Sequence, residues 1–263
     1  MTVLAVDSDM LLFRCLSSTE VEVQLNDWDW TRHSDCAQAM ERYWEYIDTW
    51  CSQTACDRST VAHCFTHGSA YRRRIFPTYK HNRKDKPKPI GFGAMRAQLM
   101  SEPNAFCFSE IEADDVISLF ASMPGNEVVV ASGDKDLNQI PGWHVWIDTD
   151  PFLISDEEAE RFTWIQYLTG DATDGIPGCP GVGAVGAKKI VDALDLSRPM
   201  DCWEAIVRVY GKKGKVDDPH SFALTQARLV RMLRWGEYDF DNNTVKPWTP
   251  PIPTSSSASS NNR

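Results

Sequence analysis

The chain has 263 residues, of which 42% are hydrophobic and 11% aromatic, and it contains 15 Gly and 15 Pro. These values exclude collagen-like and wholly disordered proteins and fit one large or two small globular domains. The 27 basic and 37 acidic residues give a net charge of −10. By itself this charge argues against a nucleic-acid-binding protein, because phosphates attract Lys and Arg.

The sequence predicts a cytoplasmic protein with no membrane contact. No apolar run approaches the roughly 20 residues that a membrane-spanning helix needs, and the N-terminus lacks the basic lead and cleavage site of a signal peptide. The eight Cys are scattered, with no CxxC pair and no His at zinc spacing, so we expect reduced thiols in the core.

In the first half of the chain, short apolar runs alternate with helical periodicity. Strands are predicted at residues 1–6, 61–65 and 127–131, and helices at 36–51 and 111–121. This alternation predicts an α/β fold with a parallel sheet and helices on both faces. Ligands of such sheets bind beyond the carboxyl ends of the strands. Four polar residues follow strands and are expected there: Asp7, His67, Asp134 and Asp136.

After about residue 160 helical patterns replace the strands. Helices are predicted at 158–168, 186–194, 201–210 and 222–234. We therefore divide the chain into an α/β core at 1–160, a helical region at 161–245 and a tail at 246–263. The tail holds four Pro and five Ser with almost no apolar periodicity, which predicts disorder.

Carboxylates concentrate at the predicted loops and helix starts. Each has an ordinary explanation as a turn residue or a helix-dipole partner, but their recurrence after apolar segments favours a cation site, because packed carboxylates repel one another. Oxygen ligands select Mg²⁺ or Mn²⁺ rather than Zn²⁺. Two such ions roughly 4 Å apart predict in-line displacement at phosphorus. The carboxylates are Asp7, Asp9, Glu112, Asp114, Asp115, Asp134, Asp136, Asp171 and Asp174.

Two further segments suit a phosphate backbone. Eight basic residues and one acid lie between Arg72 and Lys88. Residues 181–186 match the dinucleotide-binding pattern GxGxxG, but a Pro-containing loop precedes them where a Rossmann fold needs a strand, so we reject that match. A glycine turn followed by Lys188 and Lys189 suits a sequence-independent grip on nucleic acid. A simple packing corner between helices is the alternative.

Five segments in order carry a family resemblance: 6–9 (VDSD), 76–83 (FPTYKHNR), 111–115 (IEADD), 132–136 (SGDKD) and 170–174 (GDATD) with the glycines that follow. Together they resemble the 5′-nuclease superfamily of flap endonucleases and the 5′ nuclease domain of bacterial DNA polymerase I, above all the short bacteriophage 5′–3′ exonucleases. The resemblance implies a PIN-like core with a basic arch at 72–92 and a helix–three-turn–helix around 175–193 on duplex DNA. It also implies a monomer, in the host cytoplasm if a phage encodes it.

The resemblance also implies roles for individual residues. The first metal ion would take Asp7, Glu112, Asp114 and Asp115, and the second Asp134, Asp136, Asp171 and Asp174. Lys80 would contact the scissile phosphate and act with Asp7 and Asp134 in catalysis. The remaining DNA contacts would be Arg72, Arg83 and Lys84 in the arch, and Gly181, Gly183, Gly186, Lys188 and Lys189 on the duplex. The implied cofactors are two Mg²⁺ ions, with Mn²⁺ as a substitute, and K⁺ at the helix–three-turn–helix.

One residue departs from the family pattern, because His67 stands where the family usually has an Asp after the second strand. His67 is either a ligand that shifts the metal preference, since His is a poorer Mg²⁺ ligand, or a hydrogen-bonded loop residue.

The leading hypothesis is a metal-dependent 5′–3′ exonuclease on duplex DNA ends, nicks or flaps that also removes RNA primers from hybrids. Two alternatives stay open. In a haloacid-dehalogenase-like phosphatase, Asp7 and Asp9 after the first strand would be the nucleophile and the acid. In a non-catalytic, structure-specific DNA-binding protein, His67 would mark a disabled site.

Overall fold

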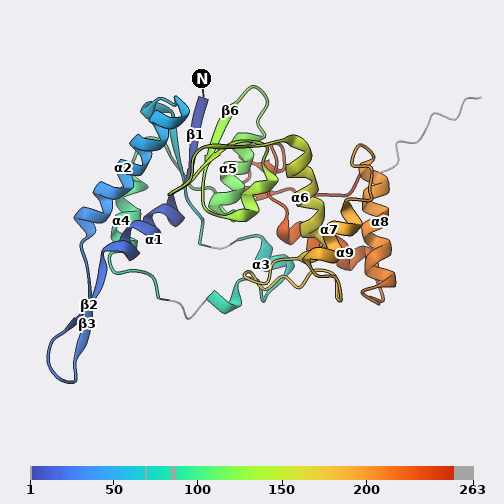
Figure 1. Ribbon diagram of the computed structural model, residues 1–263, viewed down its shortest axis with the longest axis horizontal. Coiled ribbons are helices and arrows are strands. Elements are labelled where there is room, and N and C mark those ends of the chain that lie inside the picture. The colour runs from blue at the N-terminus through green and yellow to red at the C-terminus, as the bar shows by residue number, and fades with distance from the viewer. Residues whose placement is uncertain (1, 69, 84–86, 252–263) are drawn as a thin grey trace, which may run out of the picture.

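A six-stranded sheet forms the centre of the protein in a computed structural model that describes residues 2–68, 70–83 and 87–251 (Figure 1). The strand order is β5-β4-β1-β6-β7-β8. All neighbouring strands pair in parallel except β7 and β8, which confirms the predicted α/β class. The strands are β1 (Thr2–Asp7), β4 (Val61–Cys64), β5 (Ala105–Phe106), β6 (Glu127–Ala131), β7 (Gly142–Val145) and β8 (Phe152–Ile154).

Both faces of the sheet are covered, as the apolar strands require. Leu4 and Val6 of β1 lie in a cluster with side chains of α1 (Ser8–Thr19), α2 (Cys36–Thr54) and α4 (Phe92–Leu99). Ala5 points the other way, into a cluster with α5 (Ala113–Ala121). Because successive side chains of a strand alternate between faces, one buried strand supplies two cores.

The C-terminal part is helical and lies on the right in Figure 1. Its helices are α6 (Asp156–Thr169), α7 (Ala184–Val191), α8 (Pro199–Lys212) and α9 (Pro219–Val230), followed by the short strands β9 (Tyr238–Asp239) and β10 (Thr244–Val245). The four helices overlap the four predicted ones. Their core also takes in Ala70 and Tyr79, so the segment after β4 packs against this region.

Several boundaries differ from the prediction, and three of them have a clear physical reason. α5 begins at Ala113, two residues later than predicted, because Glu112 is an extended N-cap with φ of −94° and ψ of 164°. α6 begins at Asp156, inside the range predicted for the core, because Ser155 and Glu158 form a capping box there. Residues 246–251, predicted as part of the disordered tail, pack through Trp248, whose ring lies 5.5 Å from that of Trp203. The rest of the tail, 252–263, lies outside the described residues.

Several elements had no sequence prediction. Besides α1 and α4, β2 (Glu20–Gln24) and β3 (Trp30–Ser34) form an antiparallel hairpin that projects from the sheet at the lower left of Figure 1. The described part of the predicted arch at 72–92 contains α3 (Arg72–Ile75) and the 3-10 turn η2 (His81–Arg83). Two further 3-10 turns are η1 (Arg58–Thr60) and η3 (Lys135–Gln139). Within the described residues, no helix combines the length and the apolar character needed to cross a bilayer.

Candidate active site

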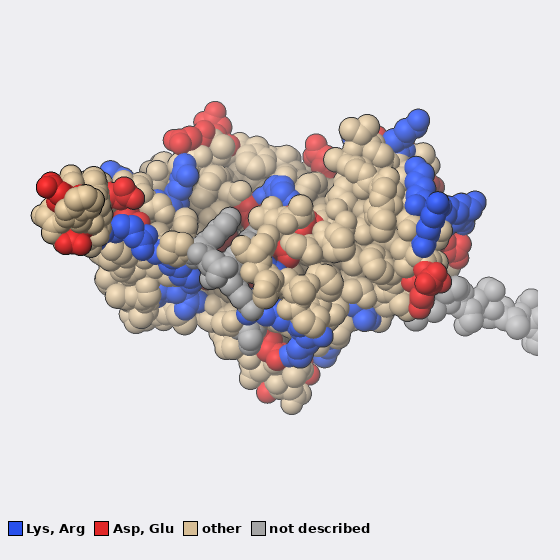
Figure 2. Space-filling view, turned by 90° about the horizontal axis from the view of Figure 1, so that it is seen from below, with Lys and Arg blue, Asp and Glu red and all other residues tan. Residues whose placement is uncertain are grey.

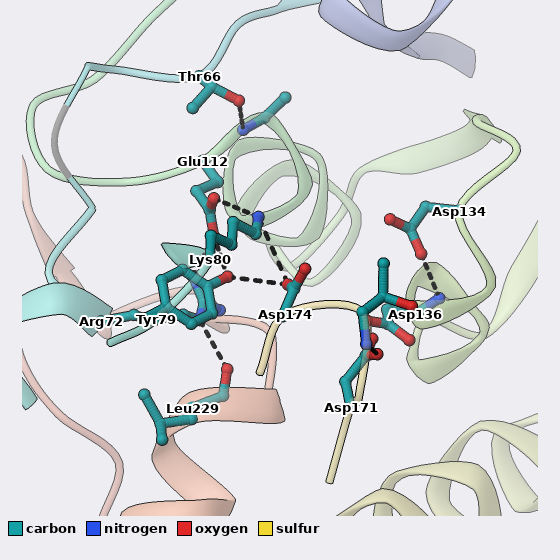
Figure 3. Close-up of polar contacts among 12 residues, drawn as sticks. Thr66, Arg72, Tyr79, Lys80, Glu112, Asp134, Asp136, Asp171, Asp174 and Leu229 are labelled. Carbon is teal, nitrogen blue, oxygen red and sulfur yellow. Dashed lines mark hydrogen bonds and ion pairs between the residues drawn. The ribbon is translucent and has the colours of Figure 1, made fainter. Parts of the chain in front are cut away.

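Part of the predicted acidic set lies together in Figure 3, namely Glu112, Asp134, Asp136, Asp171 and Asp174. Asp7 is the last residue of β1, and Asp134 and Asp136 follow β6. The register aligns Val6 of β1 with Ala131 of β6, so these two strands end side by side. The other acids come from the start of α5 and from the loop after α6, which reach the same edge from elsewhere in the chain.

Asp136, Asp171 and Asp174 form a compact group, here called the three-carboxylate cluster. Each is buried, and each offers an oxygen within 4.8 Å of the others. Burial, the charge of Asp134 and a hydrogen bond with Asp171 raise the pKa of Asp136 to about 6. Although burial opposes it, that same bond together with the Thr173 N–H lowers the pKa of Asp171. The all-oxygen donor set fits Mg²⁺ or Mn²⁺.

Asp7 at the end of β1 and Asp114 in α5 form a second group. Burial, with the charges of Asp9 and Asp134, raises the pKa of Asp7 to about 7. Burial, with the charges of Asp7 and Asp134, raises the pKa of Asp114 well above its usual value. Asp7 is held in place by hydrogen bonds from the Met10 N–H (3.0 Å) and the Ser132 hydroxyl (3.2 Å). Carboxylates that destabilise one another's charge in this way suit a site that binds a cation.

Asp134 lies between the two groups. Its charge contributes to the raised pKa of Asp7 in one group and of Asp136 in the other. One of its oxygens accepts the Asp136 N–H at 2.9 Å, which holds the carboxylate at the start of η3.

Glu112 has cationic neighbours instead. Its Oε1 lies 2.5 Å from the Lys80 ammonium, and its Oε2 accepts from the Tyr79 hydroxyl at 2.6 Å. Burial alone would raise the pKa of Glu112, but Lys80 and Arg72 lower it to about 2. The Lys80 ammonium is also 3.5 Å from Asp174, so it bridges residues of the two predicted ligand sets (Figure 3).

Arg72 and Asp115 differ from their predicted roles. Their side chains are buried, at 2% and 0% exposure, and form a bidentate ion pair with N–O distances of 2.5 and 2.8 Å. Arg72 also donates to the carbonyls of Leu229 (2.8 Å) and Arg231 (3.0 Å). Its guanidinium is therefore enclosed, with no surface for a DNA phosphate, and Asp115 is occupied as its partner. We replace the predicted DNA contact and metal contact with this structural pair.

His67 makes hydrogen bonds within its own loop. Its Nδ1 accepts the Glu110 N–H at 3.2 Å, and its own N–H donates to the Ile111 carbonyl at 3.0 Å. These bonds fix the loop that leads into α5, and His67 lies outside the three-carboxylate cluster.

Sequence reasoning missed two polar residues that hold the site together. Arg96 of α4 donates to Asp9 at 2.6 Å and to the Thr66 carbonyl at 2.7 Å, which ties α4 to the ends of β1 and β4. Gln166 of α6 donates to Asp136 at 2.7 Å. Neither residue belongs to a motif, and the only signal that could have found them is their long-range pairing.

The glycine turn joins α6 to α7. Gly170 and Gly178 have φ of +62° and +66°. They face each other, and a Cβ on either would lie 2.3 to 2.5 Å from backbone atoms on the opposite side of the turn. This close approach explains why glycines are needed there. Gly183 is the N-cap of α7, and Gly181 (φ of +74°) lies before it.

The remaining predicted DNA contacts lie in α7 and η2, or outside the described residues. Gly186 is in α7, and Lys188 and Lys189 are exposed at its last turn, where Lys188 pairs with Asp192 at 2.6 Å. Arg83 ends η2, whereas Lys84 lies outside the described residues. Figure 2 shows Lys and Arg side chains along this lower face on both sides of the grey segment.

A family model described as "5'-3' exonuclease, N-terminal resolvase-like domain" matches residues 2–163, the part that carries the sheet and most of the acids. The chain belongs to this 5′–3′ exonuclease family. It is 26% identical to the exodeoxyribonuclease of Enterobacteria phage T3 over 94% of the chain and 93% of that protein.

Solved structures agree with the fold of this family member. The structure of T5 5′-exonuclease with divalent metal ions (zinc) bound has a TM-score of 0.61 at 18% identity, covering 88% of this chain and 89% of that one. The T5 flap endonuclease in a pseudo-enzyme-product complex with DNA and metal ions has a TM-score of 0.53 at 17% identity, covering 88% and 99%. Both likenesses show a mixed α/β fold built on a central parallel sheet.

Proposed function

We propose that this protein is a divalent-metal-dependent 5′–3′ exonuclease that hydrolyses phosphodiesters of duplex DNA from 5′ ends, nicks or flaps. The observation that carries the proposal is the three-carboxylate cluster, together with Lys80, which lies against Asp174 of that cluster and against Glu112. Family membership and the similarity to the phage T3 exodeoxyribonuclease support it. They do not favour the phosphatase or the non-catalytic alternative.

We place two hard cations in the site. The oxygens of the three-carboxylate cluster lie close enough together to hold one of them. The other would be held by Asp7, Glu112 and Asp114, and the charge of Asp134 acts on both sets. Mg²⁺ or Mn²⁺ bound there would supply positive charge for the activation of a water and for the leaving oxygen. The carboxylates would position these charges. Burial first, and repulsion among neighbouring carboxylates after it, raise the pKa values of Asp7 and Asp114.

Lys80 would hold the scissile phosphate. Its ammonium lies between Glu112 and Asp174, 16% exposed, and these two acids raise its pKa even though burial opposes protonation. A cation kept charged at this position is suited to stabilise the additional negative charge of a phosphoryl transition state. The neighbouring carboxylates orient its ammonium. The backbone of Lys80 is held separately, because its N–H donates to the backbone carbonyl of Asp174 at 2.9 Å.

Duplex DNA would lie along α7 and the glycine turn. The first turn of α7 follows Gly183, which has no side chain to cap its amides, and this leaves a helix N-terminus suited to a phosphate. Gly181, Gly186, Lys188 and Lys189 would contribute backbone and charge contacts, and K⁺ would bind at the turn. Arg83 and Lys84 would contact the 5′ strand. Removal of RNA primers, action as a monomer and location in a host cytoplasm complete the proposal.

The test pairs two Asp→Asn variants. Asp171→Asn removes one ligand from the three-carboxylate cluster, whereas Asp201→Asn changes an exposed Asp on α8. Each protein is incubated with an internally labelled duplex and a 5′-flap substrate in Mg²⁺, Mn²⁺ or EDTA. We expect short 5′ products from the wild type and Asp201→Asn with either metal, none in EDTA, and about 100-fold less cleavage by Asp171→Asn with its DNA affinity retained.

Three results would contradict the proposal. Full activity of Asp171→Asn would refute the site, and binding of DNA without cleavage in either metal would favour the non-catalytic protein. A phosphoaspartate on Asp7 would favour the phosphatase.

A further inference from the structure

Two buried glutamines stand behind the three-carboxylate cluster. Gln166 of α6 is 3% exposed, and its amide nitrogen donates to Asp136 Oδ1 at 2.7 Å. The Gln166 carbonyl accepts from the amide nitrogen of Gln139 at 2.5 Å. Gln139 follows β6 in η3 and is 1% exposed. A row of two neutral amides therefore ends on one carboxylate of the candidate site.

The orientation of both amides is determined by the main chain beyond α9. The Gln139 nitrogen also donates to the Val230 carbonyl at 2.7 Å, and its oxygen accepts the Met232 N–H at 3.1 Å. A flipped Gln139 would place oxygen against oxygen at Val230 and nitrogen against an N–H at Met232. Because Gln139 presents its nitrogen to Gln166, Gln166 must present its own nitrogen to Asp136. The amide direction is thus fixed over the whole row.

The same end of α9 also supports the other acids. The carbonyls of Leu229, Val230 and Arg231 are consecutive, and carbonyls at the end of a helix lack partners within it. Arg72 donates to Leu229 and Arg231, and Gln139 donates to Val230. Arg72 continues to Asp115 and, at 3.3 Å, to Glu112. One helix terminus therefore supports hydrogen-bonded side chains behind both proposed metal sites.

We propose that Gln166, oriented through Gln139 by the C-terminal end of α9, is a positioning residue that fixes the carboxylate of Asp136 for metal binding. The proposal rests on the proposed function of the three-carboxylate cluster. Lys135 also contacts Asp136, at 3.0 Å, but its side chain is 61% exposed and carries a charge that competes with a cation. Gln166 is buried and neutral, so it restrains Asp136 Oδ1 without opposing a metal ion.

Loss of this restraint should weaken metal binding more than it weakens the fold. Residues that orient metal ligands through hydrogen bonds typically change metal affinity by about 10–100-fold. Gln166→Leu removes the donor and keeps an apolar side chain of similar length. Gln139→Leu leaves Gln166 in place but free to turn its amide, so its effect should have the same direction and be smaller.

The chain offers a matched control in Gln226. This residue of α9 is 1% exposed and accepts the Gly178 N–H at 2.9 Å. Gln226→Leu therefore removes an equally buried amide that bonds to the backbone and not to a carboxylate. It reports the effect of general destabilisation on metal binding.

The measurement is the Kd for Mn²⁺ of each DNA-free protein, from the electron paramagnetic resonance signal of free Mn²⁺, with the urea unfolding midpoint measured alongside. Cleavage of a 5′-flap substrate as a function of Mn²⁺ gives a second reading. We expect Gln166→Leu to raise the Kd about 10–100-fold, with saturating Mn²⁺ restoring most of the cleavage. Gln226→Leu should leave the Kd unchanged.

An unchanged Kd in Gln166→Leu, or an equal rise in Gln226→Leu, would overturn the inference. If Gln166→Leu does not fold, the same comparison is made with Gln139→Leu, for which an unchanged Kd is equally decisive. Failure of the proposed function looks different, because the wild type itself would then neither bind Mn²⁺ nor cleave. A wild type that binds and cleaves, beside a Gln166→Leu variant that binds equally well, would refute the positioning role alone.

Discussion

Adjacent arginines of the basic strip have opposite environments. Arg72 is 2% exposed and paired with Asp115, whereas Arg73, the next residue on α3, is exposed to solvent. Burying two charges is tolerated here because Arg72 makes five hydrogen bonds or ion pairs to carboxylates and carbonyls. Arg72, which the sequence predicts as a DNA contact, is thus part of the core.

This contrast gives a stability prediction. Arg72→Met leaves Asp115, which is 0% exposed, without its partner, so we expect a loss of about 3–5 kcal/mol in the free energy of unfolding. Arg73→Met should change it by less than about 0.5 kcal/mol. Urea unfolding followed by circular dichroism measures both values. Similar stabilities for the two variants would mean that the Arg72–Asp115 pair contributes little to the fold.

The sequence predicted the positions of the acids but not all of their partners. Asp7, Asp134, Asp136 and Asp171 were found because each follows an apolar segment, which is a local pattern. The ion pairs that separate structural from site carboxylates join residues far apart: Arg72 and Asp115 are 43 positions apart, and Arg96 and Asp9 are 87. Local spacing contains no information on such pairs, so Asp115 and Asp9 look like the other acids.

At the scale of elements, predictability followed burial. β1, β4 and β6 are apolar runs because both of their faces are covered, and all three were predicted within a residue or two. The hairpin of β2 and β3 was missed although residues 20–24 alternate between polar and apolar side chains. Most of its residues are exposed, so neither strand forms the continuous apolar run that marks β1, β4 and β6.

The glycine turn between α6 and α7 combines a strained backbone with close packing. A Cβ at position 178 would lie 2.4 Å from the Thr169 carbonyl carbon, and φ there is +66°. At Gly183 a Cβ meets nothing within 4 Å, and φ is −86°. The two glycines are five residues apart in one segment. Comparing Ala at each position therefore shows whether glycine is needed at position 178 in particular or whether any substitution in this segment lowers stability.

We therefore expect Gly178→Ala to lose at least about 2 kcal/mol of stability, since a left-handed non-glycine residue costs about 1–2 kcal/mol and the clash adds to it. Gly183→Ala should lose about 1 kcal/mol or less, as is typical of N-cap changes to Ala. Thermal unfolding of the two variants in parallel is the measurement. A Gly178→Ala protein as stable as Gly183→Ala would show that the turn can open without cost.

At the scale of the whole molecule, the net charge of −10 and the proposed DNA substrate are compatible. Among the residues that the structure describes, six carboxylates are buried, namely Asp7, Glu112, Asp115, Asp136, Asp171 and Asp174, so they contribute little to the surface that a duplex meets. Exposed acids gather at the hairpin, at the left end of Figure 2. The interior of the site thus accounts for part of the acidic composition, and the positions of the exposed charges, rather than their sum, decide where a duplex can lie.

The interior behind this site also makes stability depend on pH. His63 of β4 is 4% exposed, and its Nδ1 lies 2.8 Å from the Tyr43 hydroxyl of α2. Burial, together with the positive charge of Arg58, lowers the pKa of His63 to about 4. The Ser8 hydroxyl lies 2.8 Å from the same hydroxyl and 3.4 Å from the His63 Nδ1. The imidazole is therefore neutral in the folded protein wherever the unfolded chain begins to bind a proton, near pH 6.5.

Because the folded pKa of His63 is lower than the unfolded one, the unfolded state binds more protons, and His63 contributes stability at neutral pH that is lost as the pH falls through 6.5 towards 4. Between pH 7.5 and 5 this loss amounts to about 2 kcal/mol. His63→Gln keeps a hydrogen-bonding side chain and removes the titration, while the buried carboxylates remain the same in both proteins. We expect the stability of the wild type relative to His63→Gln to fall by about this amount over that range, measured by urea unfolding at each pH. A difference that is constant with pH would mean that the buried imidazole can take up its proton without disturbing the fold.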